Sequence, residues 1–156
     1  MDAEVINPFI NATRNVVATM AGISPKPEKP RLKRDHASTM DFTGVVGLAG
    51  DGAKGSFAVS FSQSCIERIV RNMLGDEIED MEQDVRDAVG ELANMISGGA
   101  RAELEQKGYS FDMAVPTLIA GRGHRIFQLT EMPVLVVPFN TEDGPFTVEV
   151  CLKSGR

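Results

Sequence analysis

One long amphipathic segment, from about Asp80 to Lys107, constrains the fold more than any other feature and predicts a single helix. At about 100° per residue its apolar side chains fall within roughly 80° of one another and form one stripe: Val85, Val89, Leu92, Ile96 and Ala100. Gly108 follows as the expected stop. At about 1.5 Å per residue the helix would be about 40 Å long. It must therefore cross the whole domain with one face covered.

Shorter patterns surround this helix. Asn7 and Pro8 predict the N-cap and the first position of a helix that ends before Gly22. Apolar alternation predicts strands at 40–48, 56–61 and 146–152, with turn signals at 51–52 and 143–144. A further helix, capped by Ser62 or Ser64, is expected to end at Gly75.

The remaining segments also favour β-structure. Residues 111–119 predict one strand, and 124–129 with 132–139 predict a second that is interrupted near Pro133. We expect the order α-β-β-β-α-α-β-β-β, which contains a faint duplication of one helix followed by three strands. The predicted fold class is therefore α+β: an antiparallel-rich β-sheet packed against helices, with pseudo-two-fold internal duplication.

Composition narrows the function classes. The 156 residues fit one domain, 1–156, and 42% hydrophobic residues supply a core. The net charge of −6 argues against nucleic-acid binding, which depends on lysine and arginine. No apolar run has membrane-spanning length, and no secretory signal is expected at the start. Cys65 and Cys151 are expected to be buried free thiols, so we expect a cytoplasmic protein without a membrane partner.

The polar side of the long helix carries the candidate site. Asp87, Glu91, Asn94, Gly98 and Arg101 follow one another at spacings of four and three residues, so they form one outer row. Asparagine and interior glycines are poor helix formers, which makes this row unusual for a plain solvated face. A missing side chain at Gly98 would let another surface approach the helix closely, whereas Gly99 is expected to face the sheet.

The segment 84–98, with sequence DVRDAVGELANMISG, resembles the signature of the CheC/CheX/FliY phosphatases of bacterial chemotaxis. That signature has an acidic helix start, Glu-x-x-Asn, an apolar pair and a small residue. The opening Asn7-Pro8-Phe9 helix and the run 116–124 extend the resemblance over most of the chain. The single strong motif and the short length favour the CheX branch of this family.

The resemblance implies a function and its residues. Such proteins remove the phosphoryl group from the aspartate of a CheY-like response regulator. Asn94 would orient the attacking water and Glu91 would pair with the regulator's active-site lysine. Mg²⁺ is expected in the partner response regulator, with no cofactor or metal of the chain's own. A homodimer joined through the sheets is also implied.

Several alternatives stay open. Asp87 and Arg101 could flank the docking surface with Gly98, although Arg101 could equally pair with Glu105. The acids of 76–87 favour the helix dipole and could attract a regulator's lysines. The basic run 26–34 predicts a solvated edge or loop. Rival functions are a non-catalytic regulator-binding scaffold and a flagellar-switch component.

Two further motifs are weaker. Glu4 and Asn7 repeat the Glu-x-x-Asn spacing, but Asn7 is better explained as an N-cap. His36 and His124 have no Cys or His partners at ligand spacing, so a metal site is not expected.

Overall fold

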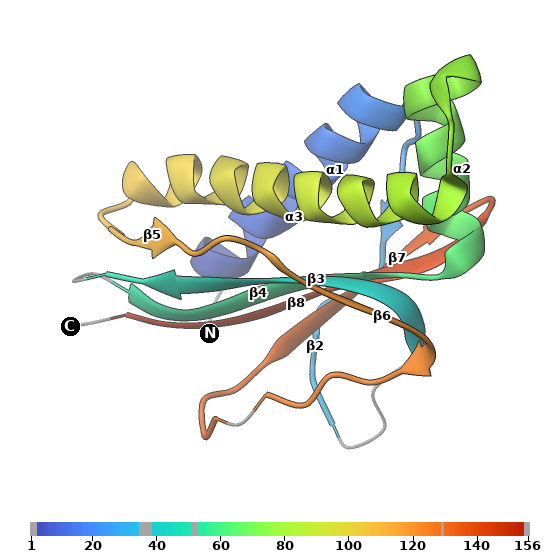
Figure 1. Cartoon of the computed structure of the whole chain (residues 1–156). Helices are drawn as coiled ribbons and strands as arrows, with labels where there is room; N and C mark the ends of the chain where they lie inside the picture. The colour runs from blue at the N-terminus through green and yellow to red at the C-terminus, as the bar shows by residue number, and fades with distance from the viewer. Residues whose placement is uncertain (1–2, 35–38, 51–52, 129, 155–156) are drawn as a thin grey trace.

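The computed structural model describes residues 3–34, 39–50, 53–128 and 130–154. Three α-helices lie on one face of an antiparallel sheet (Figure 1). They are α1 (Ala3–Ala21), α2 (Gln63–Leu74) and α3 (Met81–Glu105), with a short 3-10 turn η1 (Gly75–Glu77) between the last two. The predicted α+β class is confirmed. No helix within these residues is both long and apolar enough to cross a membrane.

The described residues form eight strands, and all of their pairings are antiparallel. Their bounds are β1 (Lys26–Pro27), β2 (Arg31–Leu32), β3 (Met40–Ala49), β4 (Ala53–Phe61), β5 (Asp112–Met113), β6 (Thr117–His124), β7 (Leu135–Thr141) and β8 (Gly144–Ser154). Four strands therefore follow α1 and four follow α3, where three were predicted. The difference comes from two-residue strands, which are too short to show alternation. The predicted turn at 51–52 lies outside the described residues.

The pairing of the strands is two-fold. β4 and β8 lie together at the centre, β3 and β7 flank them, and the outer strands of each half of the chain pair with the other half. β1 and β2 pair with β7, whereas β5 and β6 pair with β3. The repeated element order predicted two similar halves but not this exchange of strands between them.

α1 and α3 cross at the centre of the helical layer. A Cβ added to Gly99 of α3 would lie 3.2 Å from Ala12 Cβ of α1. The expectation that Gly99 faces the sheet is therefore wrong, because α1 covers that side of the helix. Phe9 of α1 stacks on Phe57 of β4, with ring centroids 5.4 Å apart, and ties the helical layer to the sheet.

The first helix begins earlier than predicted. α1 starts at Ala3, so Asn7 is an exposed residue within the helix and not its N-cap. Pro8 lies in the helix interior, where it cannot donate to the carbonyl of Glu4. The ammonium of Lys107 lies 3.5 Å from that carbonyl oxygen and donates to it instead. This long-range donor replaces the hydrogen bond that Pro8 cannot make.

The predicted N-cap residue of α2 is confirmed, but its side chain does not satisfy the end of the helix. Ser62 occupies the N-cap position, but its hydroxyl donates to the carbonyl of Pro145 at 2.7 Å. Asp41 of β3 accepts from the backbone N–H of Gln63 at 2.8 Å and from that of Gly123 at 3.0 Å. One carboxylate therefore fixes both the start of α2 and the end of β6.

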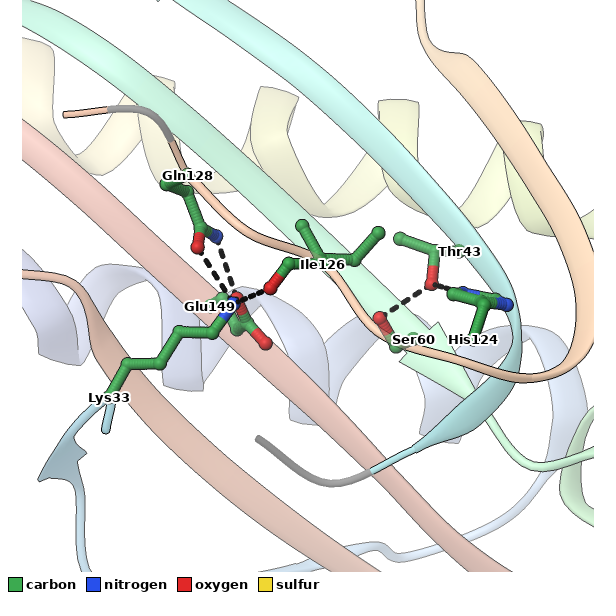
Figure 2. A network of polar contacts seen from close by, with 7 residues as sticks. All are labelled: Lys33, Thr43, Ser60, His124, Ile126, Gln128 and Glu149. Atoms are coloured by element: carbon green, nitrogen blue, oxygen red, sulfur yellow. Dashed lines mark hydrogen bonds and ion pairs between the residues drawn. The ribbon is translucent and has the colours of Figure 1, made fainter. Parts of the chain in front are cut away.

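The connection from β6 to β7 crosses the sheet face opposite the helices. Strand β6 ends at His124, so the predicted strand 124–129 is wrong beyond that residue, and Leu129 lies outside the described residues. Figure 2 shows how polar side chains hold this connection to the sheet. His124 Nε2 lies 2.6 Å from Thr43 Oγ1, which lies 2.7 Å from Ser60 Oγ. Side-chain hydrogen bonds on this face of the sheet thus hold the start of the connection, where the pairing of a β-strand was expected.

A second polar cluster lies further along the same connection (Figure 2). Lys33 Nζ donates to the carbonyl of Ile126, to Gln128 Oε1 at 2.7 Å and to Glu149 Oε1 at 2.7 Å. The side chains of Lys33 and Glu149 are only 10% and 8% exposed. The expectation of a solvated basic run is therefore wrong for Lys33, whose charge is paired inside the fold.

Candidate functional site

The start of α3 is fixed by its own acidic residues. Asp80 is the N-cap, and its carboxylate accepts from the backbone N–H of Glu82 at 3.1 Å. Asp84 accepts from the backbone N–H of Glu79 at 3.2 Å, and Arg86 pairs with Glu82 at 2.6 Å. These acids lie where the helix dipole favours negative charge.

The predicted buried stripe is confirmed. Each of its five residues is at most 2% exposed. The helix lies close to β3 because Gly44 has no side chain: an added Cβ would lie 2.9 Å from Ala93 Cβ and 3.3 Å from the carbonyl oxygen of Val89. This contact fixes the rotation of α3 about its axis and therefore decides which residues face outward.

The outer row faces away from the sheet as predicted. Asp87, Glu91 and Asn94 are exposed, and Gly98 and Arg101 are partly exposed. Asp87 accepts from the side-chain amide of Gln83 at 2.9 Å. Within the described residues, the carboxylate of Glu91 and the carboxamide of Asn94 have no hydrogen-bond partner. Both side chains are therefore available to another molecule.

Asn94 stands between two glycines on its side of the helix. Gly90 lies one turn before it and Gly98 one turn after it. An added Cβ at Gly90 would have no described atom within 4 Å, and one at Gly98 would meet Met113 Cε at 3.8 Å. Packing does not require either glycine. Their missing side chains leave Asn94 standing clear of its neighbours, so another surface can approach the helix closely.

Arg101 has a structural partner that the sequence did not suggest. Its Nε donates to the carbonyl of Phe111 at 2.7 Å, and its guanidinium lies 3.7 Å from Asp112. Arg101 does not pair with Glu105 in this arrangement. The guanidinium therefore holds the segment that leads into β5 against the end of α3. No local pattern could have indicated this contact, because it depends on the chain turning back after the helix.

The row on α3 has a counterpart on α1. Glu4, Asn7, Asn11 and Arg14 follow the same spacing as Glu91, Asn94, Gly98 and Arg101, and all four are exposed. Asn7 is not an N-cap, so the explanation given above for the Glu-x-x-Asn spacing of Glu4 and Asn7 is wrong. The surroundings differ, because Asn7 is followed by Pro8 and Asn11 carries a side chain where α3 has Gly98. Asn11 also donates to Glu103 at 3.5 Å.

The other candidates are structural. His124 donates through Nδ1 to the carbonyl of Gly121 at 2.7 Å and contacts Thr43 through Nε2. His36 lies outside the described residues. No group of three or more His, Cys, Asp or Glu suited to a metal occurs among the residues that the structure describes. Both cysteines are buried and free, and burial raises the pKa of the Cys65 thiol from 9.0 to about 11.

The clefts of the molecule lie elsewhere. A cleft of about 1350 Å³ is lined by residues of β3, β4 and β8, by 112–114 at β5, and by Gln128 and 130–133. Another, of about 510 Å³, lies at the first turns of α3 near Arg86 and Arg122. Asn94 lines neither. It projects from a convex helix surface, a shape suited to entering another protein's pocket.

Comparison with known proteins identifies the family. The family model described as chemotaxis phosphatase CheX matches residues 42–140, more than half of the chain. The chain belongs to this CheX family. It is 31% identical, over 99% of both chains, to the CheY-P phosphatase CheX of Thermotoga maritima.

Solved structures of CheX-like proteins share the fold over nearly the whole chain. A putative chemotaxis protein from Desulfovibrio vulgaris Hildenborough is 47% identical, with a TM-score of 0.90 over 96% of this chain and 97% of that one. The CheX–CheY–BeF3–Mg²⁺ complex from Borrelia burgdorferi matches with 26% identity and a TM-score of 0.80, over 96% and 97%. In that CheX relative, the fold thus occurs in complex with CheY.

Proposed function

We propose that this protein hydrolyses the aspartyl phosphate of a CheY-like response regulator, with Asn94 as the residue that orients the attacking water. The observation that carries the proposal is the exposed carboxamide of Asn94, unbonded within the described residues and flanked by two glycines on the outer face of α3. The naming of the Thermotoga maritima relative as a CheY-P phosphatase supports the choice of substrate.

The chemistry needs little from this chain beyond positioning. An acyl phosphate is labile, and phosphoryl transfer through a loose transition state depends mainly on an aligned nucleophile and stabilised charge. A carboxamide can accept a hydrogen bond from water through its oxygen and donate to a phosphoryl oxygen through its nitrogen. Asn94 would thereby hold the water in line with the breaking P–O bond. No nucleophilic side chain is needed.

Glu91 would fix the docking. It lies almost one turn before Asn94, is exposed, and has no partner within the described residues. A lysine beside the regulator's phosphorylation site would pair with this carboxylate, and the pair would set the register of the two proteins. Asp87 extends the negative charge along the same face.

The Mg²⁺ of the reaction is assigned to the regulator. The complex of the Borrelia burgdorferi relative with CheY contains Mg²⁺ and BeF3. A cation bound by the regulator would stabilise the charge on the phosphoryl oxygens, and this chain would supply the water-orienting amide. We place this reaction in the cytoplasm, where response regulators act.

Phosphate release from a phosphorylated response regulator of the same cell tests the proposal. Asn94→Ala should lower the release rate by about 100-fold or more, because the water loses its orientation, while regulator binding survives. Asn7→Ala is the matched control, since it removes the same exposed amide from α1. If Asn94→Ala releases phosphate as fast as the wild type, Asn94 does not act as proposed. Binding without any release by the wild type would favour the scaffold instead.

We further propose a homodimer joined through the sheets. Two of the exposed large apolar residues, Leu32 and Phe127, line one groove of about 380 Å³ beside the β6–β7 connection, away from the outer row. Exposed apolar area of this kind suits an interface between copies. Light scattering at increasing concentration tests it, and a monomer at the highest concentration would contradict it.

A further inference from the structure

Val115 is the most exposed large apolar side chain of the described residues, at 87%. It lies between β5 and β6, in the segment that runs alongside α3 (Figure 1). An isolated exposed aliphatic residue is ordinary on a protein surface. Val115 differs because its position is fixed by neighbours and lies beside the candidate site.

Contacts on both sides make the segment rigid. Upstream, Arg101 Nε donates to the carbonyl of Phe111 at 2.7 Å. Immediately before Val115, the backbone N–H of Ala114 donates to the carbonyl of Gly47 in β3 at 2.9 Å. Downstream, Thr117 pairs with Val45 as β6 begins. Val115 is therefore presented on an ordered support, so little conformational entropy would be lost when a partner covers it.

The same segment borders the Asn94 side of α3. Met113 Cε lies 3.8 Å from the position of a Cβ at Gly98, one turn after Asn94. At about 100° per residue, Asn94, Gly98 and Arg101 lie within about 60° of one another, and Gly98 and Arg101 both contact this segment. Arg101, which holds the segment, points about 20° to one side of Asn94. Glu91 points about 60° to the other side, toward Gly99 and α1. A surface over Asn94 therefore meets the segment that carries Val115 on the Arg101 flank and Glu91 on the other.

We propose that Val115 is a second docking residue for the phosphorylated response regulator, supplying an apolar contact that sets affinity. This inference rests on the proposed function, since it assumes that the partner covering Asn94 is the regulator. The occupant is an apolar patch of the regulator that lies next to its phosphorylation site. The two bare glycines allow the approach, Glu91 provides the charged contact and Val115 the apolar one. Val115 does not touch the reacting atoms, so it contributes to binding without changing the chemical step.

Steady-state phosphate release with the same regulator tests this role. Val115→Ser should raise KM about ten-fold and leave kcat unchanged, because the apolar contact is lost. Val115→Ile should keep the wild-type KM. The same change should appear in the Kd for regulator activated with beryllofluoride. Since Val115 is exposed, Val115→Ser should melt at the wild-type temperature.

Two controls separate the possible failures. Ala18→Ser changes an exposed apolar side chain near the end of α1, where no binding role is proposed, and should leave KM unchanged. Asn94→Ala is measured in parallel. An unchanged KM in Val115→Ser, with release abolished in Asn94→Ala, would overturn the role of Val115 and leave the proposed function standing. Wild-type release by Asn94→Ala would overturn both.

Discussion

The variant Gly90→Ala should fold without structural cost and yet bind the phosphorylated regulator more weakly. A Cβ added there has no described atom within 4 Å, and the residue is helical with no left-handed backbone. Glycine in a helix interior is less favourable than alanine by about 1 kcal/mol. Gly90→Ala should therefore stabilise the fold by about that amount, which for a chain of this size raises Tm by roughly 2–4 °C.

The functional effect should have the opposite sign. Gly90 lies one turn before Asn94, so a methyl group there stands between the helix and any surface that closes over the carboxamide. We expect the KM for the phosphorylated regulator to rise several-fold while Tm also rises. Such a trade-off is typical of sites that keep a suboptimal residue for function.

Thermal denaturation and phosphate release on the same preparation measure both effects. Gly44→Ala is the comparison, because its Cβ would lie 2.9 Å from Ala93 Cβ and should cost about 1–3 kcal/mol through overpacking. A lower Tm in Gly90→Ala would refute the reasoning about open space. A higher Tm with an unchanged KM would show that the glycine does not serve docking.

Two further predictions concern the interior. Lys33→Met should lower the free energy of unfolding by about 3 kcal/mol in thermal denaturation, because Glu149 loses its buried partner. The double variant Lys33→Met with Glu149→Gln should recover part of this loss. A loss below about 1 kcal/mol in Lys33→Met would contradict a buried pair. Burial raises the pKa of Cys65 to about 11, so its contribution to stability is present below pH 9 and falls by roughly 1 kcal/mol by pH 10 as the unfolded thiol ionises. Cys65→Ala should remove that part of the pH dependence, and an identical pH profile in both proteins would contradict it.

The elements predicted correctly are those whose signal is local. The stripe and the outer row of α3 follow from one period of 3.6 residues, which holds whatever the helix packs against. The last strand also shows clear alternation, because Phe146, Val148 and Val150 belong to the apolar core, whereas Thr147 and Glu149 are buried on the opposite, polar face. By contrast, the start of α1 was misplaced at Asn7, because Asn-Pro is typical of a helix start. The ammonium that donates to the Glu4 carbonyl in place of Pro8 belongs to Lys107, 103 residues away.

The prediction of a strand within residues 125–134 failed for a related reason. Its apolar residues suggested a strand, but a strand needs a free edge with which to pair. In the fold the described residues of this segment lie across the face of the sheet, where Lys33 and Glu149 bind Ile126 and Gln128. Nothing within the segment itself could distinguish these two environments.

The sequence by itself determined the class of fold, the two faces of α3 and the outward position of Glu91 and Asn94, because helical periodicity is a property of neighbouring residues. The tertiary structure decided what surrounds that face. It placed Met113, two residues before Val115, beside Gly98, used Arg101 to hold the segment before β5, and paired the outer strands of each half of the chain with the other half. These contacts join residues distant in the chain, and their free energies depend on the packing of the whole domain, which no local pattern records.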